Sequence, residues 1–523
     1  MTTDPGMGKH LSNNLTPMID TPAGPIIGST DLATGTYKFL GIPYARPPTG
    51  RLRWLPPQDL SAWKTPFHAE KFGMPAAQNP SNLMEVRGQN GEPPEREECL
   101  HLNIFSPAIK PGKKLPVMFW IHGGSFYMGS GCQTIYNGRY LASSGRAIVV
   151  TFNYRLGALG FLRLKDISDI PSTGNEGLLD QIAALKWVKY NISEFGGDPN
   201  NITIFGESAG AMSIVTLLEI SEFRGLYSRA IAQSGHPGAV HTVGRANLMA
   251  EAFIKHLEII SNGAAPQECS TNMLLKAQKA ILDNPDMTKN WGQLPFKPVY
   301  DSELLNCNTD HIIETKKNTG TSLLLGNNLE EWNLFSAANP DTYNLDHKKI
   351  CQQLEWLIPE RTLYPIIEYY HRQAISITDS PWPEWSRTWN LLLTDLVFTL
   401  PGLRHLKAYE GKSFHYHFTQ PLAAQPLLGA CHAAELAYIF GTHREESLQT
   451  LYGGETDAHI LCATMQEAWL SYAESGNPGN DWPLFTGMQS KRFGNHPRAR
   501  GFNAAELLSV WQDIPDETLN KYL

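Results

Sequence analysis

The sequence has no uninterrupted apolar run of about 18 residues, which is the length that a membrane-spanning helix needs. Residues 1–20 are polar and contain no apolar core of the signal-peptide kind. We therefore expect a cytoplasmic protein with no membrane anchor and no signal peptide, in which residues 1–20 form a loose arm.

An excess of basic charge is also lacking. The chain carries 43 Lys and Arg against 51 Asp and Glu, which gives a net charge of -8. Because nucleic-acid binding usually shows as clustered basic charge, we expect no nucleic-acid partner. The sequence does not decide between a monomer and a dimer.

Paired cysteines are missing as well. The seven cysteines are widely spread, odd in number and contain no CxxC motif, so a structural zinc site is not expected. This distribution is typical of reduced thiols in a cytosolic protein.

Short apolar runs do recur along the chain, and helical patterns separate them. Such runs are typical of strands in a sheet that helices cover on both faces. They lie at residues 115–121, 147–154, 202–205, 227–233, 322–325 and 412–418. The alternation, with a predicted helix at 176–195, indicates an α/β fold with a mainly parallel sheet. We expect one domain over residues 21–523, with helical insertions at about 240–300 and 335–405 that roof the sheet.

A nucleophile motif stands at residues 206–210, which read Gly-Glu-Ser-Ala-Gly. A strand is predicted before it, at 201–205, and a helix after it, at 209–219. In this context a G-x-S-x-G pattern exposes its serine on a sharp strand-to-helix turn, as in the α/β-hydrolase fold. The pattern indicates Ser208 as a nucleophile, and an incidental glycine turn is the alternative.

A second glycine motif, His122-Gly123-Gly124-Ser125-Phe126, follows the strand at 115–121. Backbone N–H groups on such a loop stabilise the oxyanion that forms when an ester is attacked. The loop precedes the serine in the chain, as it does in α/β-hydrolases, and a plain glycine turn is the alternative. Ala209, next to the serine, is expected to supply a further donor.

Further motifs make the sequence resemble the type-B carboxylesterases, the family that also holds cholinesterases and some fungal lipases. The resemblance covers nearly the whole chain from about Thr21 and is nearest to intracellular microbial carboxylesterases. It implies a serine esterase that needs no cofactor and no metal. The motifs are FLGIPYA at residues 39–45, EECLHLNI at 97–104, NYRLG at 153–157, GNEGLLDQ at 174–181 and FGGDP at 195–199.

The resemblance also implies the acid and the base of a catalytic triad. The family's pattern of strand, glycine and Asp-Glu-Gly matches GNNLEEW at residues 326–332, which aligns Glu331 as the acid and leaves Glu330 as the lesser candidate. The family's histidine motif matches CHAAEL at residues 431–436 and aligns His432 as the base. The chain has 17 histidines, and without the resemblance His432 would be interpreted as a structural histidine.

Other residues take expectations from the same alignment. The oxyanion donors are placed on Gly124 and Ser125. Glu207 and Glu435 are expected to support the triad, although His432-x-x-Glu435 could also be half of a metal site. Four aromatic residues next to the catalytic ones are expected to line the substrate pocket or to pack in the core: Phe126, Tyr127, Trp332 and Phe335.

The resemblance further implies two buried ion pairs, Arg46 with Glu97 and Arg155 with Asp180. One family disulfide is not expected, because residues 74–78 read Met-Pro-Ala-Ala-Gln where secreted members carry a cysteine that pairs with the position of Cys99. This loss agrees with a reducing compartment.

The substrate expectation comes from another departure. Residues 79–98 contain no aromatic residue, whereas the cholinesterases carry a Trp there that binds quaternary ammonium. We therefore expect hydrolysis of small-molecule, uncharged carboxylic esters with short to medium acyl chains. The alternatives are a lipase that acts on longer acyl esters at an oil–water interface and, more remotely, a non-catalytic adhesion protein.

Overall fold

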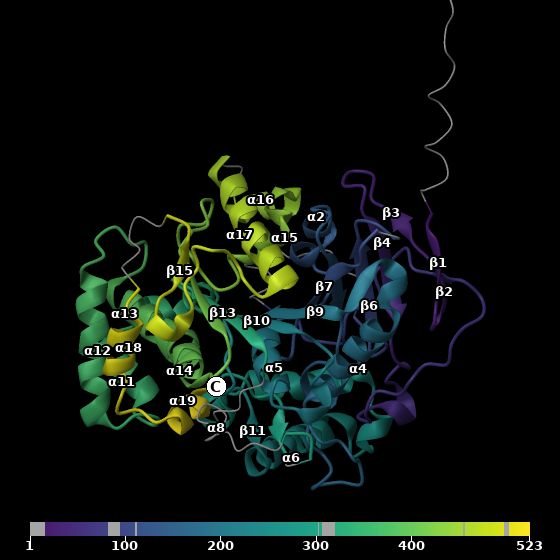
Figure 1. Cartoon of the computed structure of the whole chain (residues 1–523). Helices are drawn as coiled ribbons and strands as arrows, with labels where there is room; N and C mark the ends of the chain where they lie inside the picture. The colour runs from purple at the N-terminus through teal and green to yellow at the C-terminus, as the bar shows by residue number, and fades with distance from the viewer. Residues whose placement is uncertain are drawn as a thin grey trace, which may run out of the picture.

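The computed structural model describes residues 16–81, 95–109, 112–301, 303–305, 320–452, 456–495 and 502–523. One ten-stranded sheet runs through the middle of the molecule (Figure 1). In spatial order its strands are β15 (Lys491–Phe493), β14 (Ser413–Phe418), β13 (Ser322–Asn328), β10 (Arg229–Gln233), β9 (Gly197–Glu207), β7 (Leu115–Ile121), β8 (Ile148–Phe152), β6 (His101–Ser106), β4 (Tyr37–Pro43) and β3 (Ser29–Thr30).

Neighbouring strands are parallel from β15 to β8 and antiparallel from β8 to β3. The predicted α/β fold with a mainly parallel sheet is therefore confirmed. The run at 115–121 is β7 as predicted, while β9 begins earlier, at Gly197, and β13 ends later, at Asn328. Both extensions are strand backbone that the apolar runs alone do not reveal.

Helices cover both faces of this sheet. Alternate residues of β7 face opposite ways: Phe119 belongs to one apolar core and Trp120 to the other. Helices α4 and α5 contact β9, and α17 contacts β7 and β9 (Figure 1). The helices around the sheet are α2 (Arg139–Ala142), α3 (Gly157–Gly160), α4 (Glu176–Asn191), α5 (Ala209–Leu217), α15 (Leu436–Phe440), α16 (Glu446–Tyr452), α17 (Thr456–Ser475), α18 (Ala504–Val510) and α19 (Asp516–Tyr522).

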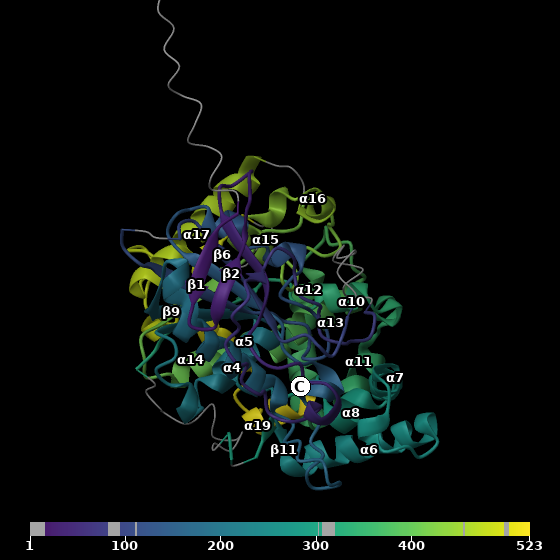
Figure 2. The same ribbon diagram turned by 90° about the vertical axis from the view of Figure 1, so that its right-hand side faces the viewer.

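Two further groups of helices lie near the segments expected to be helical insertions, the second extending from Asn333 to Ala408, and α6 and α7 pack against each other (Figure 2). A π-helical turn, Asp395–Thr399, joins α13 to α14. The groups are α6 (Val243–Ser261), α7 (Thr271–Leu282) and α8 (Met287–Trp291), and then α10 (Asn333–Ala337), α11 (His347–Leu354), α12 (Glu360–Ile375), α13 (Glu384–Thr394) and α14 (Leu400–Ala408). Within the described part of the chain, no helix combines the length and apolar character that a bilayer crossing requires.

Two small sheets complete the fold. β1 (Met18–Thr21) pairs with β2 (Gly24–Ile27), which also pairs with β5 (Phe67–His68), and β11 (His241–Thr242) pairs with β12 (Val299–Tyr300). The expected loose arm over residues 1–20 is therefore wrong at its end, because Met18 already pairs with Ile27. Residues 1–15 of that arm lie outside the described residues.

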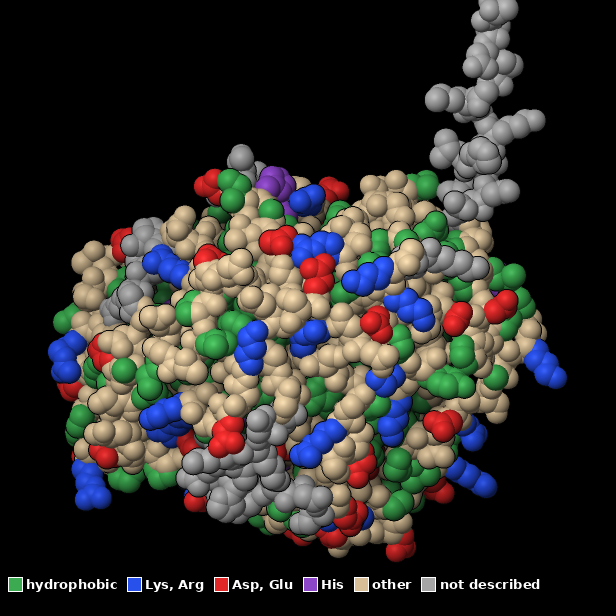
Figure 3. Space-filling view, viewed as in Figure 1, with side chains coloured by type: hydrophobic (Ala, Val, Ile, Leu, Met, Phe, Trp, Pro, Cys, Tyr) green, Lys and Arg blue, Asp and Glu red, His purple; other side chains and the backbone are tan. Residues whose placement is uncertain are grey.

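The surface carries charges of both signs (Figure 3), and the described cysteines are free thiols, as is usual in globular proteins. On the face shown in Figure 3, Lys and Arg side chains are interspersed with Asp and Glu side chains. The six cysteines among the described residues are free and buried, including Cys99, while Cys307 lies outside the described residues.

One of the two expected ion pairs is present. Arg155 donates to Asp180 through Nε and Nη2, each at 2.7 Å, and both side chains are buried. The pair joins the loop after β8 to helix α4, and the Arg155 guanidinium also donates to the carbonyl of Leu55 at 2.7 Å. The prediction for Arg155 and Asp180 is therefore confirmed.

The other expected pair is wrong. Glu97 binds Arg53 instead of Arg46, with Nε–Oε2 and Nη2–Oε1 distances of 2.9 and 2.7 Å. Arg46 is exposed, whereas Arg53 is buried and also donates to the carbonyl of Cys269. Arg53 pairs with Glu97 because both side chains are buried, and a buried charge needs a countercharge in the same place.

The buried pair yields a stability prediction. Asp180→Asn should lower the free energy of unfolding by about 3–5 kcal/mol, because it leaves the Arg155 guanidinium buried without its countercharge. The control is Asp283→Asn, which removes one partner of the exposed Lys279–Asp283 pair of α7 and should cost less than about 1 kcal/mol. Urea unfolding of both variants measures the difference, and equal losses would contradict the role given to the buried pair.

Candidate active site

The loops that carry the expected site residues leave the same edge of the sheet. The glycine loop follows β7, Ser208 follows β9, Ser234 follows β10 and Glu331 follows β13. His432 lies on the loop between β14 and α15. Because these strands are parallel neighbours, their carboxyl ends meet in the crevice where α/β proteins bind ligands.

Ser208 lies on a strained turn between β9 and α5. Its φ of 55° and ψ of -127° fall in a region that non-glycine residues rarely adopt. The turn is fixed by the Ser208 amide, which donates to the carbonyl of Gln233 at 2.8 Å. A Cβ atom on Gly206 or Gly210 would lie 2.6 or 2.0 Å from the Ile121 carbonyl oxygen, so both glycines are needed for the close approach of β7. The motif therefore folds as the sequence predicts.

Glu331 and His432 come together across 101 residues of chain, with 2.7 Å between Nδ1 of His432 and Oε2 of Glu331. The other carboxylate oxygen of Glu331, Oε1, accepts hydrogen bonds from the backbone N–H of Asn328 at 2.7 Å and from the Ser234 hydroxyl at 2.5 Å. Glu331 is fully buried. Sequence reasoning missed both donors: Asn328 lies three residues before Glu331, within the GNNLEEW motif, whereas Ser234 lies 97 residues away along the chain.

Glu330 points elsewhere. Its Oε2 accepts a hydrogen bond from the Ala430 amide at 2.8 Å. A Cβ atom on Gly429 would lie 2.0 Å from that same oxygen, which shows how closely Glu330 packs on the loop that leads to His432. Glu330 thus holds this loop, and Glu331 is the glutamate that contacts the imidazole.

Two more buried glutamates surround the histidine. Nε2 of His432 lies 3.0 Å from Oε1 of Glu207, and no hydrogen bond joins it to Ser208 in this arrangement of the described residues. Glu435 accepts from Asn328 Nδ2 at 2.7 Å and from Gln233 Nε2 at 2.9 Å. Glu207 therefore contacts His432 directly, and Glu435 is joined to the segment of Glu331 through Asn328.

These carboxylates change the ionisation of the site. Burial lowers the pKa of His432, but the negative charges of Glu207 and Glu331 outweigh it and raise that pKa above the usual value. Burial, together with the charges of Glu207 and Glu331, raises the pKa of Glu435 to about 7. Near neutral pH, Glu435 is therefore divided between its neutral and charged forms.

The glycine loop faces the serine. A Cβ atom on Gly123 would lie 2.9 Å from Cβ of Ser208. Gly124, Ser125 and Phe126 have successive positive φ angles of 118°, 55° and 63°, an unusual backbone that the Gly124 carbonyl stabilises by accepting from the amides of the next turn. Among the described residues, none accepts a hydrogen bond from the amides of Gly124, Ser125 or Ala209. These N–H groups remain available to an oxygen atom of a ligand.

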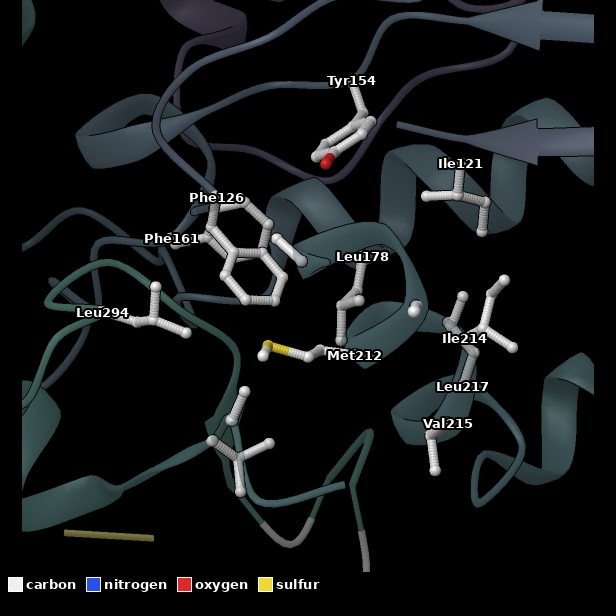
Figure 4. Close-up of a cluster of buried hydrophobic side chains, with 14 of the residues drawn as sticks. Ile121, Phe126, Tyr154, Phe161, Leu178, Met212, Ile214, Val215, Leu217 and Leu294 are labelled. Atoms are coloured by element: carbon white, nitrogen blue, oxygen red, sulfur yellow. The ribbon is translucent and has the colours of Figure 1, made fainter. Parts of the chain in front are cut away.

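The four expected pocket residues divide into two groups. Phe126 is fully buried and packs edge-on against Phe161, with 5.1 Å between ring centroids, in the apolar cluster of Figure 4. Tyr127 is half-buried, and burial raises its pKa to about 12.

Trp332 and Phe335 pack together at 4.7 Å, and the Phe335 ring lies 5.2 Å from that of His432. Phe398, which sequence reasoning missed, lies closer to His432, at 4.7 Å. Phe398 belongs to the π-helical turn and is more than 30 residues from both Phe335 and His432 along the chain. No sequence motif marks it.

Comparison with known proteins agrees with this geometry. The model of the carboxylesterase family matches residues 15–507. The para-nitrobenzyl esterase of Bacillus subtilis is 35% identical over 479 residues, which cover 90% of this chain and 92% of that protein. The cholinesterase of Mus musculus is 30% identical over 500 residues, or 89% and 80% of the two chains.

Solved structures give the same result. The crystal structure of the Geobacillus stearothermophilus carboxylesterase EST55 matches with a TM-score of 0.79 and 32% identity, covering 95% of this chain and all of that one. A structure of a PNB esterase matches with a TM-score of 0.75 and 33% identity over 89% and 93% of the two chains. Matches of this extent, in sequence and in fold, show that the chain belongs to the carboxylesterase family and is a carboxylic-ester hydrolase.

Proposed function

We propose that the protein is a serine carboxylesterase that hydrolyses uncharged carboxylic esters with short to medium acyl chains through an acyl-enzyme on Ser208. The observation that carries this proposal is the buried Glu331–His432 hydrogen bond of 2.7 Å beside the strained Ser208 turn. A serine hydroxyl is a weak nucleophile until a base removes its proton, and an oriented histidine is such a base.

The reaction follows from these positions. His432 Nε2 takes the proton from Ser208 Oγ as that oxygen attacks the ester carbonyl carbon. The amides of Gly124, Ser125 and Ala209 donate to the oxyanion of the tetrahedral intermediate. The intermediate collapses, and the alcohol leaves with the proton from His432. Water then adds to the acyl-enzyme, giving its proton to His432, and the acid leaves as Ser208 regains its proton.

The imidazole must turn before this step. In the arrangement described above, Nε2 lies beside Glu207, the residue that precedes Ser208. The proposed reaction therefore requires Nε2 to exchange its contact with Glu207 for one with Ser208 while Nδ1 stays on Glu331. Glu331 also stabilises the imidazolium that forms during attack.

The substrate class is proposed from the same surroundings. Trp332, Phe335 and Phe398 give the site an apolar aromatic wall against His432. The aromatic-free stretch at 79–98 supports a preference for uncharged esters, although its residues 82–94 lie outside the described residues. The buried free cysteines support a reducing compartment such as the cytoplasm. No observation favours the lipase or adhesion alternative.

The triad proposal predicts the effect of three substitutions. Ser208→Ala should preserve the fold and reduce ester turnover by several orders of magnitude. Glu331→Gln should be far more damaging than its neighbour Glu330→Gln, because Glu331 contacts the imidazole and Glu330 contacts the backbone. Steady-state kinetics with p-nitrophenyl acetate measure both effects. Equal activity in the two Gln variants would refute Glu331 as the acid.

The pH profile should show the influence of the carboxylates. The neutral imidazole is the active form, so kcat/KM should rise with pH through the pKa of His432. Because Glu207 and Glu331 raise that pKa, the midpoint should lie above about 6.5, the ordinary value of histidine. Glu207→Gln should move the midpoint to lower pH, since it removes a charge 3.0 Å from Nε2. An unmoved midpoint would contradict this influence.

Matched acetyl esters test the substrate proposal. A neutral ester should be turned over with a higher kcat/KM than acetylcholine, because the choline cation must lose water without an aromatic face in residues 79–98 to compensate. The chemical step is the same for both esters, so the difference reports binding. An equal or higher kcat/KM for acetylcholine would overturn the preference for uncharged esters.

A further inference from the structure

The π-helical turn Asp395–Thr399 places an aromatic ring directly on the histidine. Phe398 is buried, and its ring centroid lies 4.7 Å from that of His432 with a 37° angle between the planes. Phe335 lies 5.2 Å from His432, and the two phenylalanine rings are 6.1 Å apart at 19°. The imidazole therefore has an apolar neighbour on its ring face and carboxylates at its two nitrogen atoms.

The carboxylates and the apolar neighbours have opposite effects on the pKa of His432. The carboxylates of Glu207 and Glu331 stabilise the imidazolium, whereas burial destabilises it and is the largest single influence on the pKa of His432. A base that is held too firmly in its protonated form cannot accept the serine proton. The site therefore depends on groups that keep water and further polarity away from the ring.

Hydrogen bonds fix the turn to the loop of the acid. The amide of Trp332, the residue after Glu331, donates to Oγ1 of Thr394 at 3.1 Å. Nδ2 of Asn327 donates to Oγ1 of Thr399, also at 3.1 Å. These contacts join the residue before the turn and the last residue of the turn to positions on either side of Glu331, so Glu331 and Phe398 lie on directly connected segments.

The outer side of the turn is fixed as well. The Tyr370 hydroxyl donates to Asp395 Oδ2 at 2.8 Å, and Trp511 Nε1 donates to the Tyr370 hydroxyl oxygen at 2.8 Å. A cavity of about 480 Å³ lies on this side, and Thr394, Asp395 and Thr399 are among its lining residues. Phe398 is absent from that lining and contacts His432 instead. The turn thus lies between His432 and this cavity, whose lining combines charged and apolar side chains.

A π-helical turn contains one residue more per turn than an α-helix and rotates the side chains that follow it, and such turns often occur at functional sites. We propose that Phe398, set by this turn, is a positioning residue that excludes water from the face of His432 and so lowers the pH at which the base becomes available. This inference rests on the proposed role of His432 as the base.

A ring face also attracts a cation, and this attraction acts in the reverse sense by favouring the imidazolium. Desolvation of a fully buried group is the larger effect, up to about 3–5 pKa units. Removal of the ring should therefore favour the imidazolium and raise the pKa of His432.

The experiment compares kcat/KM for p-nitrophenyl acetate against pH in three variants. Phe398→Ala should move the acidic limb to higher pH by about one unit, because it admits water to the ring face. Phe398→Leu keeps an apolar side chain there and should restore the wild-type midpoint. The matched control is Phe414→Ala, which removes a buried ring that contacts Tyr472 and Trp482 and should lower the melting temperature without moving the limb.

Two outcomes overturn the proposal: a wild-type midpoint in Phe398→Ala, or the same shift in Phe414→Ala. If Phe398→Ala does not fold, the half-buried Phe335 provides the test, because Phe335→Ala should shift the limb in the same direction and an unmoved limb refutes the inference. His432→Ala separates the two levels. Substantial activity in that variant refutes the proposed base, whereas an inactive His432→Ala with unmoved phenylalanine variants refutes only the role of Phe398.

Discussion

A buried carboxylate must find hydrogen-bond donors, and in this protein the carboxylate of Glu331 is the group around which the site is arranged. Its two oxygens receive hydrogen bonds from His432, Asn328 and Ser234. These donors come from the ends of β10 and β13 and from the loop after β14. An unpaired charge in such a place would cost several kcal/mol, so the parallel register of the strands and the position of the histidine loop are constrained together.

The need to bring Glu331 and its donors together also explains why the site contains strained backbone and several closely spaced carboxyl groups. Ser208 has a left-handed φ and is held by the close approach of β7, whereas the run of positive φ angles from Gly124 to Phe126 is held by hydrogen bonds to the Gly124 carbonyl. Glu207, Glu331 and Glu435 share one buried region with His432. Burial, together with the charges of Glu207 and Glu331, raises the pKa of Glu435. Phe335 and Phe398 lie on the face of His432 and, as proposed above, oppose the effect of the carboxylates on its pKa.

Features with local causes could be predicted from the sequence. The strand at 115–121, the turn at Ser208 and the glycine loop follow from apolar runs and glycine positions that act within a few residues. Family resemblance supplied Glu331, His432 and the Arg155–Asp180 pair. What failed depends on distant contacts: Glu97 pairs with Arg53 because both are buried against the same loop. Ser234 and Phe398 reach Glu331 and His432 only through the tertiary fold, and no sequence pattern encodes the contact of His432 with Glu207.

The most direct test of the central claim is to trap the nucleophile. The protein should be treated with diethyl p-nitrophenyl phosphate, an uncharged phosphate ester that transfers its diethylphosphoryl group to an activated serine. Peptide mass spectrometry then locates the group. The account predicts one modification, on Ser208, with loss of esterase activity in proportion to labelling. Loss of activity with the label on another residue, or full activity after Ser208 is modified, would contradict it.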